Sequence, residues 1–285
     1  MPPEPLVLSE VERGRQAYRR SRTTRSFAIA GSSTVVFLVV AAFAIVSSPG
    51  WDRVRESFLD VDVARKSFVP ILGGLWLNIR VLVVAAVLVL LLGLLIALLR
   101  TVRGPVFFPF RALATVYTDV FRGFPLIIML YLIGFGLPGL RLSGTPTDPV
   151  VLGTIAIVLT YSAYVAEVLR AGIESVHPSQ RAAARSLGLS HSQTMRIVVL
   201  PQAFRRVLPA LLNDFVALQK DVGLISVLGA VDAVRQAQIL SSLYADFTPY
   251  VVAGLLFLLL AIPSGRFADW VTLRQARRQN AGGVL

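Results

Sequence analysis

One apolar stretch of this sequence carries an unusual set of polar side chains. Between residues 207 and 228 most residues are apolar, yet the stretch includes Asn213, Asp214, Gln219, Lys220 and Asp221. These groups can exchange hydrogen bonds and balance charge, but they do not form a nucleophile with an adjacent base. Charge at the centre of a bilayer costs at least about 2.5–3.5 kcal/mol, so such residues usually face protein or water. They could pair for structure or gating, or they could line a path for a charged solute.

Residues for bond-making chemistry are scarce. The 285 residues include no cysteine and only two histidines, His177 and His191, which fall in one polar stretch. No Gly-x-Ser-x-Gly or His-Glu-x-x-His motif is present. The two lysines, Lys66 and Lys220, do not follow the glycines of a phosphate-binding loop. We therefore expect no catalytic site, no metal, no cofactor and no ATP hydrolysis by this chain itself.

Membrane-spanning helices are the elements that must position these side chains. Hydrophobic residues make up 55% of the chain and charged residues only 15%, whereas soluble domains carry about 25% charged residues. A spanning helix needs about 20 mostly apolar residues. We predict an all-α, polytopic membrane protein whose permease domain, residues 27–270, has about six spans, at 27–47, 71–99, 117–137, 150–168, 205–228 and 248–264. A count of five would make 205–228 a surface helix and put the two ends on opposite sides.

The arginines orient these spans. The segments with most of the basic charge are the N-terminal tail (1–26), the connections after the second and fourth spans, and the C-terminal tail (271–285) with the residues just before it. Together they hold 20 of the 28 basic residues: Arg13, Arg15, Arg19, Arg20, Arg22, Arg25, Arg100, Arg103, Arg111, Arg122, Arg170, Arg181, Arg185, Arg196, Arg205, Arg206, Arg266, Arg274, Arg277 and Arg278. Positive charge accumulates on the cytoplasmic side, so we predict that both termini are cytoplasmic. Because this charge follows alternate loops and forms no single patch, we expect no nucleic-acid partner.

The connection at residues 170–204 is long and contains two predicted short helices. Pro178 is placed to open the first helix, and Gly188 is placed to end it in a left-handed conformation. Ser190 and Gln193 have the spacing of a capping box for the second helix, which we expect to reach Leu200 before Pro201 breaks it. Isolated helices of about ten residues are marginal in water, so these two need a docking partner. That partner could be the membrane surface of this protein or a second protein.

This loop resembles the cytoplasmic signature of importer permeases of the ATP-binding-cassette superfamily. That signature is Glu-Ala-Ala, three residues, Gly, nine residues and Ile-x-Leu-Pro. The chain has Ala182, Ala183 and Ala184, then Gly188 after three residues, and then Val198, Val199, Leu200 and Pro201 after nine more. Ala182 replaces the glutamate, which removes any ion pair that the glutamate would make.

The resemblance extends from about Leu72 to Trp270 and is similar to the polar amino-acid branch of the family. It includes YTDVFRGFP at 117–125, SAYVAEVLRAGI at 162–173, and the prolines of Leu200–Ala203 and Leu208–Ala210. Where this branch commonly has Lys-Asp-Thr-Ser-Leu, the chain has Lys220, Asp221, Val222, Gly223 and Leu224, so two hydroxyls are lost.

Two pairs of opposite charge have the three-residue spacing of neighbours on a helix: Glu167 with Arg170, and Asp119 with Arg122. We predict that both are structural pairs.

The resemblance implies a transport subunit of a prokaryotic cell membrane that imports polar amino acids, with a weak lean to glutamate. It implies a second permease, identical or homologous, a separate ATPase, an extracytoplasmic substrate-binding protein and surrounding membrane lipid. It places the ATPase-coupling function at Ala182, Ala183, Ala184, Gly188, Leu200 and Pro201. The residues expected along the translocation path or its gate are Asn213, Gln219, Lys220 and Asp221.

Two other classes remain as alternatives. An intramembrane enzyme would need a nucleophile, paired acids or a metal cluster at membrane depth, and the sequence offers none of these. An ion-coupled secondary transporter could use Lys220 and Asp221, but such transporters are usually larger and contain internal repeats, which are not evident here. Dependence of uptake on ATP or on a proton gradient separates the importer from the secondary transporter.

Overall fold

The structure is a computed structural model, and it describes residues 9–102 and 104–281. Every regular element within these ranges is a helix, so the predicted all-α class is confirmed. Residues 1–8 and 282–285 of the two predicted tails, and Arg103, lie outside the described residues, as do the side chains of Arg13, Arg15, Arg19, Arg20, Arg277 and Arg278.

The chain divides into two compact units, residues 1–57 and 58–285. In the first unit, α1 (Glu10–Val46) is one unbroken helix, and the Ser9 side chain accepts a hydrogen bond from the Glu12 N–H to cap it. The predicted tail is therefore helical from Glu10, and the predicted span 27–47 lies largely within the same helix. A short turn leads to α2 (Trp51–Phe58), which ends at the boundary between the units.

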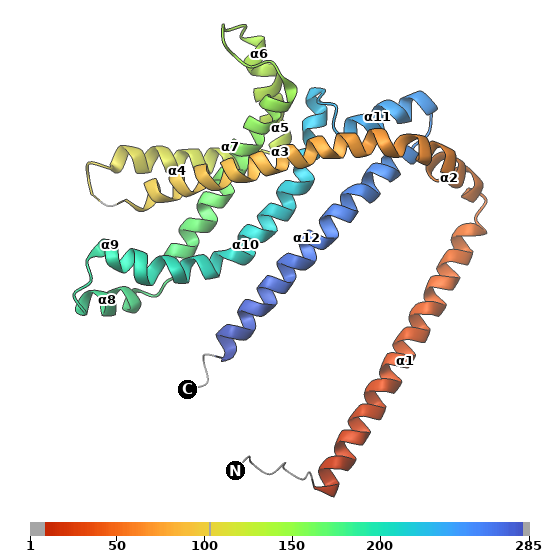
Figure 1. Cartoon of the computed structure of the whole chain (residues 1–285), viewed down its shortest axis with the longest axis horizontal. Coiled ribbons are helices and arrows are strands. Elements are labelled where there is room, and N and C mark those ends of the chain that lie inside the picture. The colour runs from red at the N-terminus through yellow and green to blue at the C-terminus, as the bar shows by residue number, and fades with distance from the viewer. Residues whose placement is uncertain (1–8, 103, 282–285) are drawn as a thin grey trace. The chain divides into compact units, whose positions relative to one another are not determined.

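Three helices meet at the centre of the second unit: α3 (Val61–Thr101), α7 (Pro149–Glu174) and α10 (Leu200–Asp221). The buried residues that join them include Val81, Val89, Ile157, Val165 and Leu218. A small residue lets α3 approach α7 closely, because a β-carbon at Gly93 would lie 2.8 Å from Cγ1 of Val165. Figure 1 shows the long α3 crossing α7 near the middle of this unit.

The third predicted span is broken. The region folds as α4 (Phe108–Gly123) and α5 (Leu126–Tyr131), which continues through the π-helical η1 (Leu132–Gly136) into α6 (Leu137–Gly139). The two halves, 108–123 and 126–139, are bent by 105°, so the region of the predicted span 117–137 is not one straight helix. A residue before proline is disfavoured in helical geometry, and Phe124, with ψ of 131°, turns the chain just before Pro125.

The helices after the central contact return to the start of α3. α10 continues as the 3₁₀ helix η3 (Val222–Leu228), which ends at Gly229 with a left-handed φ of 92°. α11 (Ala233–Tyr244) and α12 (Thr248–Ala281) follow. The Asn78 side chain of α3 joins this region, since its amide nitrogen donates to Asp232 Oδ2 at 2.9 Å and its oxygen accepts from the Ala233 N–H at 3.1 Å.

Four helical stretches of the described chain are long and apolar enough to cross a membrane: Arg22–Val46, Trp51–Thr101, Pro149–Glu174 and Thr248–Gln275. The bent pair of α4 with α5 makes five if it forms one broken span. α10 is not among them, because charged residues such as Arg205, Lys220 and Asp221 lower its hydropathy. A spanning role for 205–228, and with it the count of six, stays a prediction.

Candidate coupling loop and polar helix residues

The loop between α7 and α10 begins with the predicted short helix and stop. α8 (Pro178–Ser186) is capped by His177, whose ring nitrogen accepts from the Ser179 N–H. Gly188 has a φ of +82°, and the Leu189 N–H donates to the Ala184 carbonyl oxygen at 3.2 Å. This is the left-handed C-terminal motif expected from the sequence. The turn after α8 is therefore fixed by backbone geometry.

The second helix starts as predicted but does not stop at Pro201. Ser190 and Gln193 form a capping box for α9 (His191–Gln193), since each side chain accepts from the backbone N–H of the other. The π-helical η2 (Thr194–Val199) then leads directly into α10, and Pro201 lies in the first turn of α10. The expected break was wrong, because the chain passes through the π-helical η2 into α10 and stays helical at Pro201.

The loop is anchored to the ends of both neighbouring helices. Ile173, Val176, Val199 and Ala203 form a buried apolar cluster beneath it. The Arg181 guanidinium donates to the Ile173 carbonyl oxygen, and Arg206 Nη1 donates to the Ser175 carbonyl oxygen. These contacts tie α8 and the start of α10 to the end of α7.

Several apolar residues of the loop are exposed among polar and charged ones such as Arg185 and Arg196. Ala182, Ala183, Gly188 and Leu200 are exposed, whereas Ala184 packs inward. Leu187 is 82% exposed and Ile197 is 60% exposed, although both are large aliphatic residues. The sequence did not single out Leu187 or Ile197, because exposure depends on how the two short helices are set. Leu187 and Ile197 are therefore available for contact with a partner.

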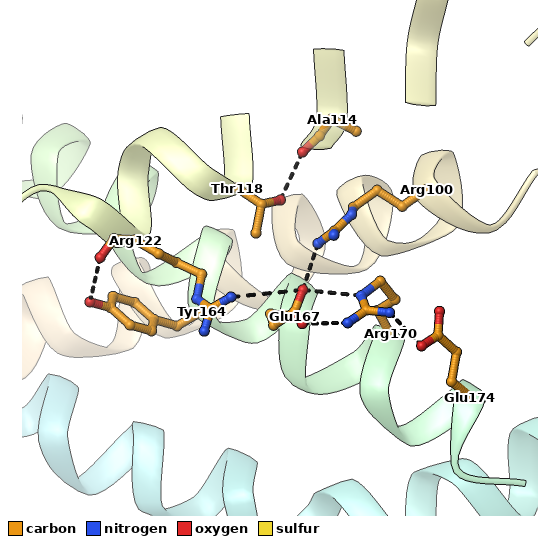
Figure 2. A network of polar contacts seen from close by, with 8 residues as sticks. All are labelled: Arg100, Ala114, Thr118, Arg122, Tyr164, Glu167, Arg170 and Glu174. Atoms are coloured by element: carbon orange, nitrogen blue, oxygen red, sulfur yellow. Dashed lines mark hydrogen bonds and ion pairs between the residues drawn. The ribbon is translucent and has the colours of Figure 1, made fainter. Parts of the chain in front are cut away.

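A carboxylate near the loop joins three helices (Figure 2). Glu167 Oε2 of α7 lies 2.7 Å from Arg100 Nη1 of α3 and 3.9 Å from Arg122 Nη1 of α4. Arg170 donates to both Glu167 oxygens and also contacts Glu174, so the predicted Glu167–Arg170 pair is confirmed. The cytoplasmic ends of α3, α4 and α7 in the predicted topology are thus held by one charged group.

The predicted ion pair between Asp119 and Arg122 was wrong. Arg122 forms no ion pair with Asp119 in the part of the chain that the structure describes. Its guanidinium instead approaches Glu167 and lies 5.9 Å from the ring centre of Tyr164. The Tyr164 hydroxyl donates to the Arg122 carbonyl oxygen at 3.3 Å, as Figure 2 shows. Arg122 therefore approaches Glu167 of α7 in place of the predicted partner Asp119 on its own helix.

The predicted path residues of α10 occupy different environments. Asn213 and Lys220 are exposed, while Gln219 is only 1% exposed, and its Nε2 has no partner among the described residues. Asp221 Oδ2 accepts a hydrogen bond from the Tyr161 hydroxyl at 2.7 Å. Lys220 and Asp221 do not pair with each other, in agreement with their divergent directions on a helix. The structure therefore does not bring these four residues into one cluster.

One cavity of about 250 Å³ opens between α3, α7 and α10. Its walls are apolar except for Tyr161 and Asp214. No group of three His, Asp or Glu side chains within the described ranges is arranged to hold a metal ion. The residues present can bind through hydrogen bonds, charge and apolar contact.

Residues 89–277 match the family described as "Binding-protein-dependent transport system inner membrane component". The chain belongs to this family. The Bacillus subtilis (strain 168) arginine transport system permease protein ArtQ is 36% identical over 193 residues, which cover 67% of this chain and 86% of that protein. A probable glutamine ABC transporter permease of the same organism is 35% identical over 208 residues, covering 72% of this chain and 93% of that protein.

Solved structures agree with the family. The crystal structure of an amino acid ABC transporter with histidines has a TM-score of 0.69 and 34% identity, and the match covers 77% of this chain and 99% of that chain. The inward-facing methionine transporter MetNI, at 18% identity and a TM-score of 0.57, shares the fold. The predicted resemblance to a polar amino-acid ABC permease is thus confirmed. This permease is a multi-pass membrane subunit and not an enzyme, and the ATPase of such transporters is a separate chain.

Proposed function

We propose that this permease forms the translocation path of an ATP-driven importer for polar amino acids, together with a second permease that is identical or homologous. A separate ATPase subunit docks on the loop 170–204, and an extracytoplasmic binding protein delivers the substrate. Both termini lie in the cytoplasm, because the arginine-rich segments flank that side. The single observation that carries the proposal is the exposure of two large aliphatic residues, Leu187 and Ile197, on an anchored loop within a family of transport permeases.

The coupling residues have distinct roles in this proposal. Ala182 and Ala183 give α8 a shallow surface, Leu187 supplies an apolar contact, and Gly188 fixes the turn between the two short helices. Pro201 and Leu200 open α10 directly after the loop. Because the loop is bonded to the ends of α7 and α10, closure of the docked ATPase pair would move both helices together. Each ligand can shift the inward-open and outward-open states only by its differential affinity.

The proposed substrate is a polar amino acid. The relatives are named for arginine and glutamine, which supports a polar amino acid as cargo. The lean toward glutamate stays a prediction. Asn213, Gln219, Lys220 and Asp221 are proposed to line the path or its gate, with Asp221 held by Tyr161. Buried Gln219 fits a gating or structural position better than direct contact with cargo.

Co-purification with the ATPase and uptake into vesicles test this function. We expect the ATPase to co-purify with the wild-type chain, and Leu187→Asp to reduce the recovered ATPase because it puts a charge on the docking face. Arg141→Asp, in the connection between α6 and α7, is the matched exposed control and should leave recovery unchanged. Uptake that continues without ATP but stops when the proton gradient is dissipated would support a secondary transporter and contradict the proposal.

A further inference from the structure

A second, more polar cavity of about 600 Å³ lies at the end of α10 and η3 opposite the coupling loop. Its walls come from α5 with η1, from the end of η3, and from α11 and α12. The lining residues used below are Tyr131, Phe135, Gly229, Arg235, Gln238 and Tyr250. The volume is within the range of about 300–1,000 Å³ that is usual for small-molecule sites. In the proposed topology this cavity faces the side from which substrate arrives.

Arg235 supplies the charge of this cavity. Its Nη1 donates to Gln238 Oε1 at 2.6 Å, one turn along α11. None of the four ion pairs found among the described residues includes Arg235. A guanidinium presents five N–H donors in a planar fork that matches a carboxylate. Arg235 therefore retains donors for an anionic group that enters the cavity.

The backbone beneath Arg235 is held firmly. The Arg235 N–H donates to Asp232 Oδ1 at 2.9 Å, and Asn78 donates to the other oxygen of Asp232. A β-carbon at Gly74 would lie 2.5 Å from the Ala233 nitrogen, which shows how closely α3 approaches the start of α11. A binding group on such a supported element loses little conformational entropy when a ligand arrives.

Aromatic side chains that also line the cavity suit a cation. Tyr131 and Phe135 stack with ring centres 5.9 Å apart, and Tyr250 adds a third ring. Aromatic faces attract ammonium groups. The cavity therefore combines an arginine that can take an anionic group with aromatic rings that can take a cationic group.

We propose that this cavity binds the zwitterionic α-carboxylate and ammonium groups that all amino acids share, with Arg235 taking the carboxylate. This inference rests on the proposed import function and assigns a site to it. Recognition of the common backbone groups would leave side-chain selection to the binding protein and to other parts of the path. Broken helices whose ends meet charged substrate groups serve the same purpose in other transporters.

Binding to the complete complex tests this site. The complex of this chain with its ATPase is placed in lipid nanodiscs without the soluble binding protein. The probes are L-arginine and L-glutamine, compared with agmatine and 4-aminobutanamide, which lack the α-carboxylate. We expect at least one amino acid to bind about ten- to hundredfold more tightly than its decarboxylated counterpart. Arg235→Gln should abolish this preference, and Arg235→Lys should keep part of it.

Controls separate this site from a general loss of structure. Arg141→Gln removes an exposed arginine outside the cavity and should leave the preference unchanged. Basal ATP hydrolysis and the unfolding temperature of each complex report whether the variant is folded. If Arg235→Gln itself fails to fold, Gln238→Leu replaces it, because that change removes only the partner of the guanidinium, and it should reduce the preference.

Three results would overturn the proposal. The first is an unchanged preference in a folded Arg235→Gln complex. The second is a wild-type complex that transports one of these amino acids with its binding protein but binds neither probe alone. The third is an Arg235→Gln variant that weakens docking of the binding protein only, since Arg235 would then meet an acidic side chain of that protein. Failure to assemble with an ATPase, or to transport any amino acid, would instead overturn the proposed function, and the inference with it.

Discussion

Adjacent glycines of α3 differ sharply in what surrounds them, and this difference can be measured. A β-carbon at Gly74 would lie 2.5 Å from the backbone of Asp232 and Ala233, whereas nothing lies within 4 Å of one at Gly73. We expect Gly74→Ala to destabilise the fold by about 1–3 kcal/mol, because the colliding atoms are backbone atoms that cannot rotate away. Gly73→Ala should be neutral or slightly stabilising, since alanine favours a helix by up to about 1 kcal/mol over glycine.

Thermal unfolding of the two purified variants in the same detergent checks this pair. The contact between α3 and α11 is contradicted if both variants unfold at the wild-type temperature. It is also contradicted if Gly73→Ala is the more damaging change.

The Glu167 network gives a second prediction at the scale of single residues. Glu167→Gln removes the charge that Arg100 and Arg170 share, and we expect a loss of about 2 kcal/mol in unfolding free energy. Glu174→Gln is the control, because Glu174 is 59% exposed and, among the described residues, pairs only with Arg170, so it should cost less than about 1 kcal/mol. Equal unfolding temperatures for the two variants would show that Glu167 does not hold the three helices together.

At the scale of elements, the coupling loop depends on the backbone conformation of Gly188. Its φ of +82° is unfavourable for most residues with a β-carbon, at a cost of roughly 1–2 kcal/mol that is smaller for Asp and Asn. We expect Gly188→Asp to be expressed and inserted normally but to lose coupling between ATP hydrolysis and uptake, because the turn after α8 would shift. Uptake and ATPase stimulation in vesicles measure this effect.

A matched glycine lies in another connection. Gly144, between α6 and α7, has a φ of +87° and open space around it, as Gly188 does. Gly144→Asp should carry the same backbone strain without reaching the coupling loop, so uptake should remain coupled. Normal uptake by Gly188→Asp would exclude this turn from the coupling mechanism.

The sequence predicted the turn and the helix cap of the coupling loop, because both depend only on neighbouring residues. Gly188 and the Ser190–Gln193 box were correctly placed because a left-handed residue and a capping pair need only their immediate neighbours. Pro201 was misjudged, since a proline that ends one helix and a proline that opens the next look alike in sequence. The bend at Phe124 could have been found, because the residue before Pro125 is disfavoured in a helix.

Contacts between segments that are distant along the chain could not be predicted from the sequence. Arg100 lies 67 residues from Glu167, and nothing in either segment identifies the other as its partner. Arg122 was assigned to Asp119 because helical spacing favours it, yet the packing of α4 on α7 brings Glu167 within reach of Arg122 instead. The cavity around Arg235 combines five elements, so its residues could not be grouped without the fold.

At the scale of the whole molecule, the second unit should fold without the first. Residues 58–285 form a compact unit with its own buried clusters, and they contain all of the family match. We expect a chain that lacks residues 1–50, and so retains α2, to insert, to unfold near the wild-type temperature and to recruit the ATPase. Thermal unfolding and co-purification measure these outcomes. Loss of ATPase binding in the shortened chain would show that α1 contributes to assembly.

The 3₁₀ segment η3 joins the Arg235 cavity to α10 and thus to the coupling loop. A 3₁₀ helix rises about 2.0 Å per residue and an α-helix about 1.5 Å. If the seven residues of η3 adopted α geometry, the segment would shorten by about 3.5 Å, and its far end would rotate by roughly 140°. A change of pitch in this one segment would therefore alter the distance between Gly229 and Leu200 without unfolding either helix.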